Sequence, residues 1–203
     1  MDLMHHLVVT ERLRENLGWS ERRRGPMLLG TIGPDAHTEV PGVGREAMHP
    51  GGDPVAAVME MMAPPGCLDG DEGRGFAVSA IGHLIADTMT RRNRYHLPPH
   101  APTGFAELEA PAEKLQAHRS FDAEAIARAL MRAEVACWLQ PLEPEAIDGK
   151  RWELLGRFPL HEGGVFEVVE PLATVARLCA GRIAARLQSS QAAARLVAGA
   201  RSR

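Results

Sequence analysis

The sequence has few aromatic residues and no long apolar run. Aromatic residues make up 4% of the 203 residues, so no lipid-binding or base-stacking platform stands out. Ala, Leu, Val and Met carry most of the apolar content, which favours helices over sheets. No segment approaches the ~20 apolar residues that a helix needs to cross a bilayer. The composition therefore predicts a helical protein without a transmembrane segment.

The cysteines and the charge balance exclude further classes of protein. Cys67, Cys137 and Cys179 are odd in number and far apart, so neither a disulfide framework nor a thiolate zinc site is expected. A formal net charge of −3 gives no basic surface that would attract nucleic acid. The stretch from Met1 to His6 has no basic segment followed by a hydrophobic one, as a signal peptide would, so we expect a cytoplasmic protein.

The most informative stretch is Phe76-Ala-Val-Ser-Ala-Ile-Gly-His83-Leu-Ile-Ala-Asp87, which has the composition of a buried helix. Only His83 and Asp87 in it can carry charge, and their spacing places both on one face of a helix. Burying a polar group without a partner costs roughly 2–7 kcal/mol. The two side chains must therefore bond to each other or bind a metal ion, and the sequence leaves both alternatives open.

Two further candidate residues precede this helix. His6 lies on the apolar stripe of a helix predicted over residues 3–17. Asp35 follows the apolar segment 26–32, at a position where functional carboxylates often occur. The alternative for Asp35 is a turn that begins after Pro34.

A fifth candidate, His49, lies in a loop predicted over residues 39–53, which is rich in Gly and Pro. The five side chains together offer the imidazole nitrogens and carboxylate oxygens that bind zinc and similar divalent ions. Three protein ligands and a water would leave the open position that a hydrolytic metal requires. A carboxylate such as Asp87 can also bridge two ions roughly 3.5–4 Å apart. His6, Asp35, His49, His83 and Asp87 are therefore candidate ligands for zinc or a similar divalent ion.

The second half of the sequence is predicted to be helical over residues 107–116, 121–140, 144–155 and 164–188, with Ser120 and Pro144 as start signals. The last of these helices could pack on the bundle or form a homodimer. We expect an all-α fold, with residues 1–203 forming one helical bundle and a metal site between its helices. Residues 1–100 are the predicted metal-binding half, and residues 101–203 supply supporting helices.

Two motifs carry a family resemblance when they are considered together. They are Leu28-Leu-Gly-Thr-Ile-Gly-Pro-Asp35 and the Phe76–Asp87 stretch, with a fourteen-residue interval from Asp35 to His49. This pattern resembles the zinc-dependent phospholipase C family and the related S1/P1-type nucleases. The helix that contains His6 also resembles the opening histidine helix of that family. The resemblance covers about the first hundred residues.

The resemblance implies an all-α protein that gathers zinc between its helices, with the five candidate residues as ligands. It also implies that an activated water attacks a phosphodiester. Asp35 is the candidate catalytic base, unless it is used as a ligand. The N-terminal Trp ligand and the later His-x-x-x-Glu motif of the secreted phospholipases have no counterpart here, which favours one or two metal ions over three.

The sequence leaves two functions open. The first is a hydrolase that acts on a small-molecule or lipid phosphoester. The second is a non-enzymatic helical protein with a structural metal site, which acts through dimerisation or partner binding. An open coordination position would favour the hydrolase, and a closed four-coordinate site would favour the structural protein. The sequence does not decide whether any of four other histidines joins the site: His5, His37, His96 and His100.

Overall fold

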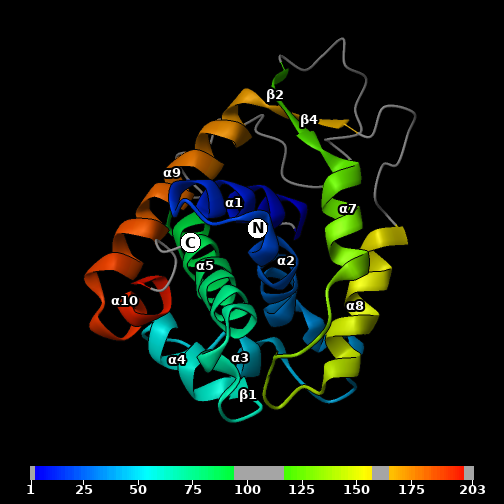
Figure 1. Cartoon of the computed structure of the whole chain (residues 1–203), viewed down its shortest axis with the longest axis vertical. Coiled ribbons are helices and arrows are strands. Elements are labelled where there is room, and N and C mark those ends of the chain that lie inside the picture. The colour runs from blue at the N-terminus through cyan, green and yellow to red at the C-terminus, as the bar shows by residue number, and fades with distance from the viewer. Residues whose placement is uncertain (1–2, 94–116, 157–164, 199–203) are drawn as a thin grey trace.

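The computed structural model describes residues 3–93, 117–156 and 165–198, which are mostly α-helical, as predicted (Figure 1). The helices are α1 (Leu3–Asn16), α2 (Arg24–Ile32), α3 (Arg45–Met48), α4 (Pro54–Met61), α5 (Asp71–Asn93), α7 (Ala123–Arg132), α8 (Pro144–Gly156), α9 (Glu170–Ser189) and α10 (Gln191–Ala198). Three 3-10 turns connect them: η1 (Glu21–Arg23), η2 (Gly33–Glu39) and η3 (Cys67–Asp69). The strands are β1 (Met62–Ala63), β2 (Ala117–Asp122), β3 (Trp138–Leu139) and β4 (Val165–Val169).

Helix α5 lies at the centre of the helical assembly (Figure 1). Helices α1, α2, α4, α9 and α10 all contact it. Asp71 and Glu72 occupy its first turn, where negative charge is favourable at a helix N-terminus. Every residue from Phe76 to Asp87 is buried, as expected for a helix that is apolar on most sides. The central helix predicted from the sequence is thus confirmed.

Helices α2 and α5 approach each other closely at Gly30. A Cβ atom at this position would lie 2.1 Å from the carbonyl oxygen of Phe76 and 2.4 Å from the hydroxyl oxygen of Ser79. All residues from Met27 to Ile32 are buried, so the end of α2 is held firmly against α5. The turn η2 follows directly, and this contact therefore fixes η2 beside the charged residues of α5.

The second half of the chain contains strands at positions predicted to be helical. Residues 117–122 form β2, which pairs antiparallel with β4. The helix predicted over residues 121–140 is shorter and forms α7, and Ser120 lies in β2 instead of capping a helix. The helix predicted from Gly164 begins at Glu170, with Pro171 in its first turn. Pairing between strands distant in sequence overrides local helix propensity here, and β4 has the β-branched and aromatic residues that favour strands.

Two further predictions concern the loop over residues 39–53 and the helix over residues 107–116. The loop predicted over residues 39–53 contains a single helical turn, α3. The helix predicted over residues 107–116 lies outside the described residues. A second small sheet pairs β1 with β3, with Met62 opposite Leu139.

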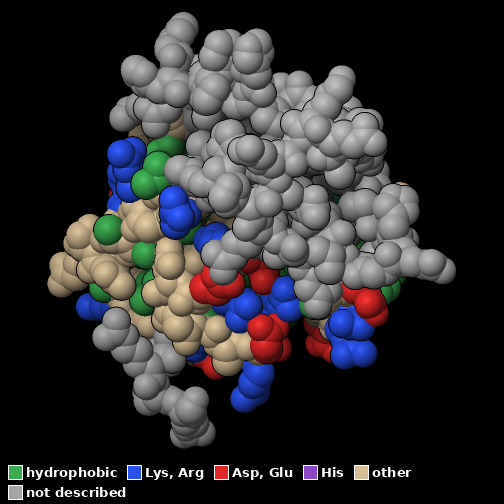
Figure 2. Space-filling model, turned by 90° about the horizontal axis from the view of Figure 1, so that it is seen from above, with side chains coloured by type: hydrophobic (Ala, Val, Ile, Leu, Met, Phe, Trp, Pro, Cys, Tyr) green, Lys and Arg blue, Asp and Glu red, His purple; other side chains and the backbone are tan. Residues whose placement is uncertain are grey.

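The surface and the helices agree with the predicted charge balance and hydropathy. Within residues 3–93, 117–156 and 165–198, no helix has the length and apolar character required to cross a membrane. Figure 2 shows acidic and basic side chains mixed together on the described part of the face seen from above. The described part of this face therefore has no extended field of one sign.

All three cysteines are free thiols. Burial raises the pKa of the Cys137 thiol to about 12 and that of the Cys179 thiol to about 11. The pKa of Cys67 is also raised, again mainly by burial. Because the thiolate is the reactive form, burial lowers the reactivity of these thiols at neutral pH.

The close approach of α2 and α5 predicts a large effect of Gly30→Ala. The added methyl group would meet the backbone of Phe76, which cannot move away as a flexible side chain could. We expect Gly30→Ala to lower the free energy of unfolding by about 3 kcal/mol, the upper part of the range for overpacked cores. Urea denaturation followed by circular dichroism measures this change.

The matched control is Gly181→Ala in α9, where an added Cβ atom would have no neighbour within 4 Å. This substitution should leave stability unchanged or raise it by about 0.5–1 kcal/mol, because Ala restricts the unfolded chain. Equal stabilities of the Gly30→Ala variant and the unmodified protein would contradict the packing described for α2 and α5.

Candidate metal centre

Two groups of potential metal ligands lie side by side in the structure. The first is His6, His83 and Asp87, all buried, and the second is Asp35, His37 and His49, all half-buried. Within each group, one ligand atom from every residue lies within 4.8 Å of the others. All five residues predicted from the sequence belong to these groups, and His37 joins them.

Four segments of the N-terminal half supply these side chains. His6 projects from α1, and His83 and Asp87 project from successive turns of α5. The turn η2 carries Asp35 and His37, and residue 49 directly follows α3. The site therefore depends on tertiary packing, because no single element holds enough ligands to bind a metal ion.

In the buried group, His6 and Asp87 are joined by a hydrogen bond. The distance from His6 Nε2 to Asp87 Oδ1 is 3.1 Å. The rings of His6 and His83 are stacked, with their centroids 3.7 Å apart and an interplanar angle of 7°. His83 and Asp87 are thus not a simple isolated pair, since the carboxylate of Asp87 also bonds to a histidine from another helix.

The two groups are close enough to share an ion or to hold two neighbouring ions. Asp35 Oδ1 lies 3.4 Å from His49 Nε2 and 3.7 Å from His83 Nε2. His49 Nε2 also lies 3.7 Å from Asp87 Oδ2. Carboxylates from both groups therefore face the same imidazole nitrogen, His49 Nε2.

The closest contact between the groups joins two histidine nitrogens, His49 Nε2 and His83 Nε2, which are 3.2 Å apart. The Nδ1 atom of His83 lies 2.9 Å from the carbonyl oxygen of Thr31, and that of His49 lies 3.3 Å from the carbonyl oxygen of Arg45. A carbonyl oxygen can only accept, so the 2.9 Å contact places the proton of His83 on its Nδ1 atom and leaves its Nε2 atom as an acceptor. When His49 also carries its proton on Nδ1, the two neutral rings present their Nε2 lone pairs to each other. A cation bound to both would convert this repulsion into coordination, and histidine ligands are commonly oriented in this way.

Burial keeps the histidines in the neutral form that binds metals. It lowers the pKa of His6 to about 3 and that of His49 to about 4, and the charge of His83 contributes in both cases. The pKa of His83 is also lowered, again chiefly by burial. Burial alone would raise the pKa of Asp87, but the hydrogen bond from His6 and the nearby imidazoles outweigh this effect and hold it below its usual range. At neutral pH the centre thus combines neutral imidazoles with a carboxylate anion.

The half-buried group opens onto a cavity of about 230 Å³. Asp35 and His37 line this cavity, together with Arg45 and Lys150. His37 Nδ1 lies 2.9 Å from the carbonyl oxygen of Pro34, which leaves its Nε2 atom available as a ligand. The centre therefore has a buried side and a side that a small molecule can reach.

These residues fit a divalent ion with nitrogen and oxygen ligands. His49, His83, Asp35 and Asp87 offer their ligand atoms to a common space, and His6 and His37 lie at its two sides. Among the ring nitrogens of these candidate ligands, His6 Nδ1 is buried and lacks a hydrogen-bond partner within the described part of the chain. The donor set of imidazoles and carboxylates suits zinc and similar ions.

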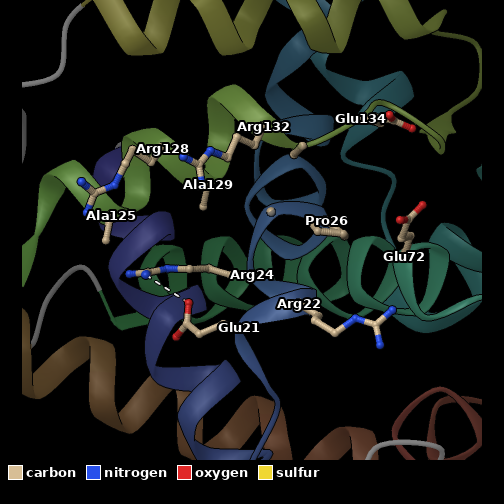
Figure 3. Close-up of a pocket in the computed structure, with 12 residues that line it drawn as sticks. Glu21, Arg22, Arg24, Pro26, Glu72, Ala125, Arg128, Ala129, Arg132 and Glu134 are labelled. Atoms are coloured by element: carbon tan, nitrogen blue, oxygen red, sulfur yellow. Dashed lines mark hydrogen bonds and ion pairs between the residues drawn. The ribbon is translucent and has the colours of Figure 1, made fainter.

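A larger cavity, of about 560 Å³, lies elsewhere, between α2 and α7 (Figure 3). Arginines and glutamates line it together, and Arg24 points toward Glu21 with a hydrogen bond of 3.2 Å. Arg128 is paired with Glu124 on its own helix. Since its lining contains no histidine or cysteine, this cavity offers no counterpart to the metal-ligand groups.

Comparison of the chain with protein-family models, curated proteins and solved structures finds no match. The resemblance to the zinc-dependent phospholipases C thus rests on the motifs and their spacing alone and stays a prediction. His96 and His100, and the side chain of His5, lie outside the described residues. Sequence analysis did not assign His37, although its position two residues after Asp35 in a turn was a usable signal.

The lowered pKa values predict that the metal-free protein loses stability as the pH falls below about 6.5. Between this pH and the folded-state pKa values of about 3 for His6 and about 4 for His49, the unfolded chain binds protons that the folded protein does not. Each histidine then contributes up to about 1.4 kcal/mol of lost stability per pH unit. Urea unfolding with a chelator present, at several pH values between about 7 and 5, measures the slope.

His49→Gln provides the control, because it removes one of the titrating groups and should reduce this slope. A free energy of unfolding that does not change over this range would contradict the burial of neutral histidines in the folded protein.

Proposed function

We propose that this protein is a metal-dependent hydrolase that cleaves a phosphodiester or another phosphoester with a metal-activated water. The observation that carries the proposal is the convergence of His49 Nε2 and His83 Nε2, 3.2 Å apart, with both Nδ1 atoms occupied by carbonyl oxygens. The carboxylates of Asp35 and Asp87 both lie near His49 Nε2, and Asp35 also lies near His83 Nε2. This arrangement calls for a cation, and one side of it is accessible from a cavity.

A bound zinc ion, or another divalent ion, would supply a coordinated water with a pKa near ~7 and a Lewis acid for the phosphoryl oxygens. The protein residues have separable roles in this scheme. His83 and Asp87 are held rigidly on α5, and the backbone of α2 fixes the ring orientation of His83. Asp35 lies at the border between the ligands and the cavity, so it can bind the ion or hold the proton of the attacking water.

The size and polarity of the cavity favour a compact polar group over a long apolar one. Its volume is about 230 Å³, and its lining includes Arg45, Lys150 and Glu153. A phosphate with a small substituent fits such a space. We propose one or two zinc ions as the cofactor. The cytoplasmic location and the homodimer stay predictions from the sequence.

The test of this function combines metal content with turnover. Elemental analysis of untagged protein should give one or two equivalents of a divalent metal. Asp87→Asn and His83→Gln should each weaken metal binding at least about 100-fold, because each removes a proposed ligand. The metal-loaded protein should hydrolyse bis(p-nitrophenyl) phosphate, and a chelator should abolish this activity.

The matched control is Asp53→Asn, since Asp53 is an exposed carboxylate that caps α4 and pairs with Arg186 far along the chain. Asn is an equally good helix cap, so metal content should not change. A protein that binds no metal even with excess zinc would remove the basis of the proposal. A protein that binds metal but cleaves no phosphomonoester or phosphodiester would instead favour the structural metal site.

A further inference from the structure

Arg45 occupies a special position, because it connects the two carboxylates of the metal centre. Its guanidinium group forms an ion pair with Asp87, and its Nη1 atom lies 3.9 Å from Asp35 Oδ1. The side chain of Arg45 is 45% exposed, whereas those of Asp87 and Asp35 are only 5% and 18% exposed. One arginine thus reaches from solvent into both ligand groups.

This contact conflicts with the binding of a divalent ion at the same carboxylates. The carboxylate of Asp35 lies 3.4 Å from His49 Nε2 and 3.7 Å from His83 Nε2, and that of Asp87 lies 3.7 Å from His49 Nε2. An ion bound among these atoms would therefore lie close to the guanidinium group. Like charges at such short distances repel each other strongly in a partly buried site. In the metal-free protein, Arg45 therefore neutralises the carboxylates that the metal would otherwise neutralise.

The side chain of Arg45 also lines the accessible cavity beside Asp35, and this cavity offers its guanidinium group a second position. Lys150 lines the same cavity, but it is held by the Thr38 hydroxyl at 3.0 Å and by the carboxylates of Glu39 and Glu153. Arg45, by contrast, pairs with Asp35 and Asp87. These are the two carboxylates that would bind the metal ion. The planar guanidinium group is well suited to bind two oxygens of a phosphate at once.

We propose that Arg45 exchanges partners when metal binds. Without metal it pairs with Asp35 and Asp87, and with metal bound it turns into the cavity and holds the non-bridging oxygens of a substrate phosphate. The phosphate part rests on the proposed function, whereas the competition with metal does not. Arg45 would then both limit metal affinity and select substrates with an accessible phosphate.

The competition is tested by zinc titration of the metal-free protein against a chromophoric chelator. Arg45→Gln removes the competing cation and should tighten zinc binding by about tenfold, the effect expected for one charge-assisted hydrogen bond. Arg186→Gln, which removes another arginine that pairs with an aspartate, is the control and should leave zinc affinity unchanged. Unchanged or weaker zinc binding by Arg45→Gln, in a protein with an unaltered circular dichroism spectrum, would overturn the exchange of partners.

The phosphate contact is tested by calorimetric titration of the zinc-loaded protein with inorganic phosphate. Arg45→Gln should weaken phosphate binding by about tenfold or more, and Arg45→Lys should fall between it and the unmodified protein. Equal phosphate affinities in all three proteins would overturn the phosphate role, even if zinc binding had tightened. Phosphate binding that depends on Arg45 in a protein without phosphoesterase activity would support this inference while refuting the proposed function.

Discussion

The hydrogen bond between His83 Nδ1 and the carbonyl oxygen of Thr31, at 2.9 Å, fixes the orientation of the His83 ring, around which the other candidate ligands are arranged. It joins the two most closely packed helices, α2 and α5, and it fixes the tautomer of a fully buried ring. The Nε2 lone pair of His83 must consequently point away from α2, toward His49 and Asp35. Gly30 makes this bond achievable, because a larger residue would force the two backbones apart.

Burial of so many polar groups is costly, and the structure offsets the cost by pairing them. Asp87 binds His6 and Arg45, and the side chain of Thr31 bonds to Thr10 on α1 at 2.6 Å. The residues thus form a connected polar network inside an apolar bundle, and most of its buried groups are satisfied. The unresolved conflict is between the two Nε2 atoms of His49 and His83. The contact between these two nitrogens, together with the His6 Nδ1 atom that has no partner among the described residues, supports the proposed metal site over simple core packing.

The sequence predicts those parts of the structure that depend on local pattern. His83 and Asp87 could be placed on one face of a buried helix because the surrounding residues are apolar. His6 could be placed inward from the stripe of its own helix, and it is 1% exposed. Arg45 could not be assigned in this way, because its position depends on where the short helix α3 packs against η2. Strand β4 was predicted as part of a helix for a related reason, since its pairing partner β2 is more than forty residues away in sequence.

X-ray absorption spectroscopy of the zinc-loaded protein tests the central claim most directly, because it identifies the atoms bound to the metal. The account predicts a first shell of nitrogen and oxygen atoms only, at about 2.0–2.2 Å, with the outer-shell scattering of at least two imidazoles. It also predicts that His83→Gln lowers the imidazole contribution. A first shell that contains sulfur, or one of water oxygens without imidazole scattering, would contradict a metal centre built from these histidines and aspartates.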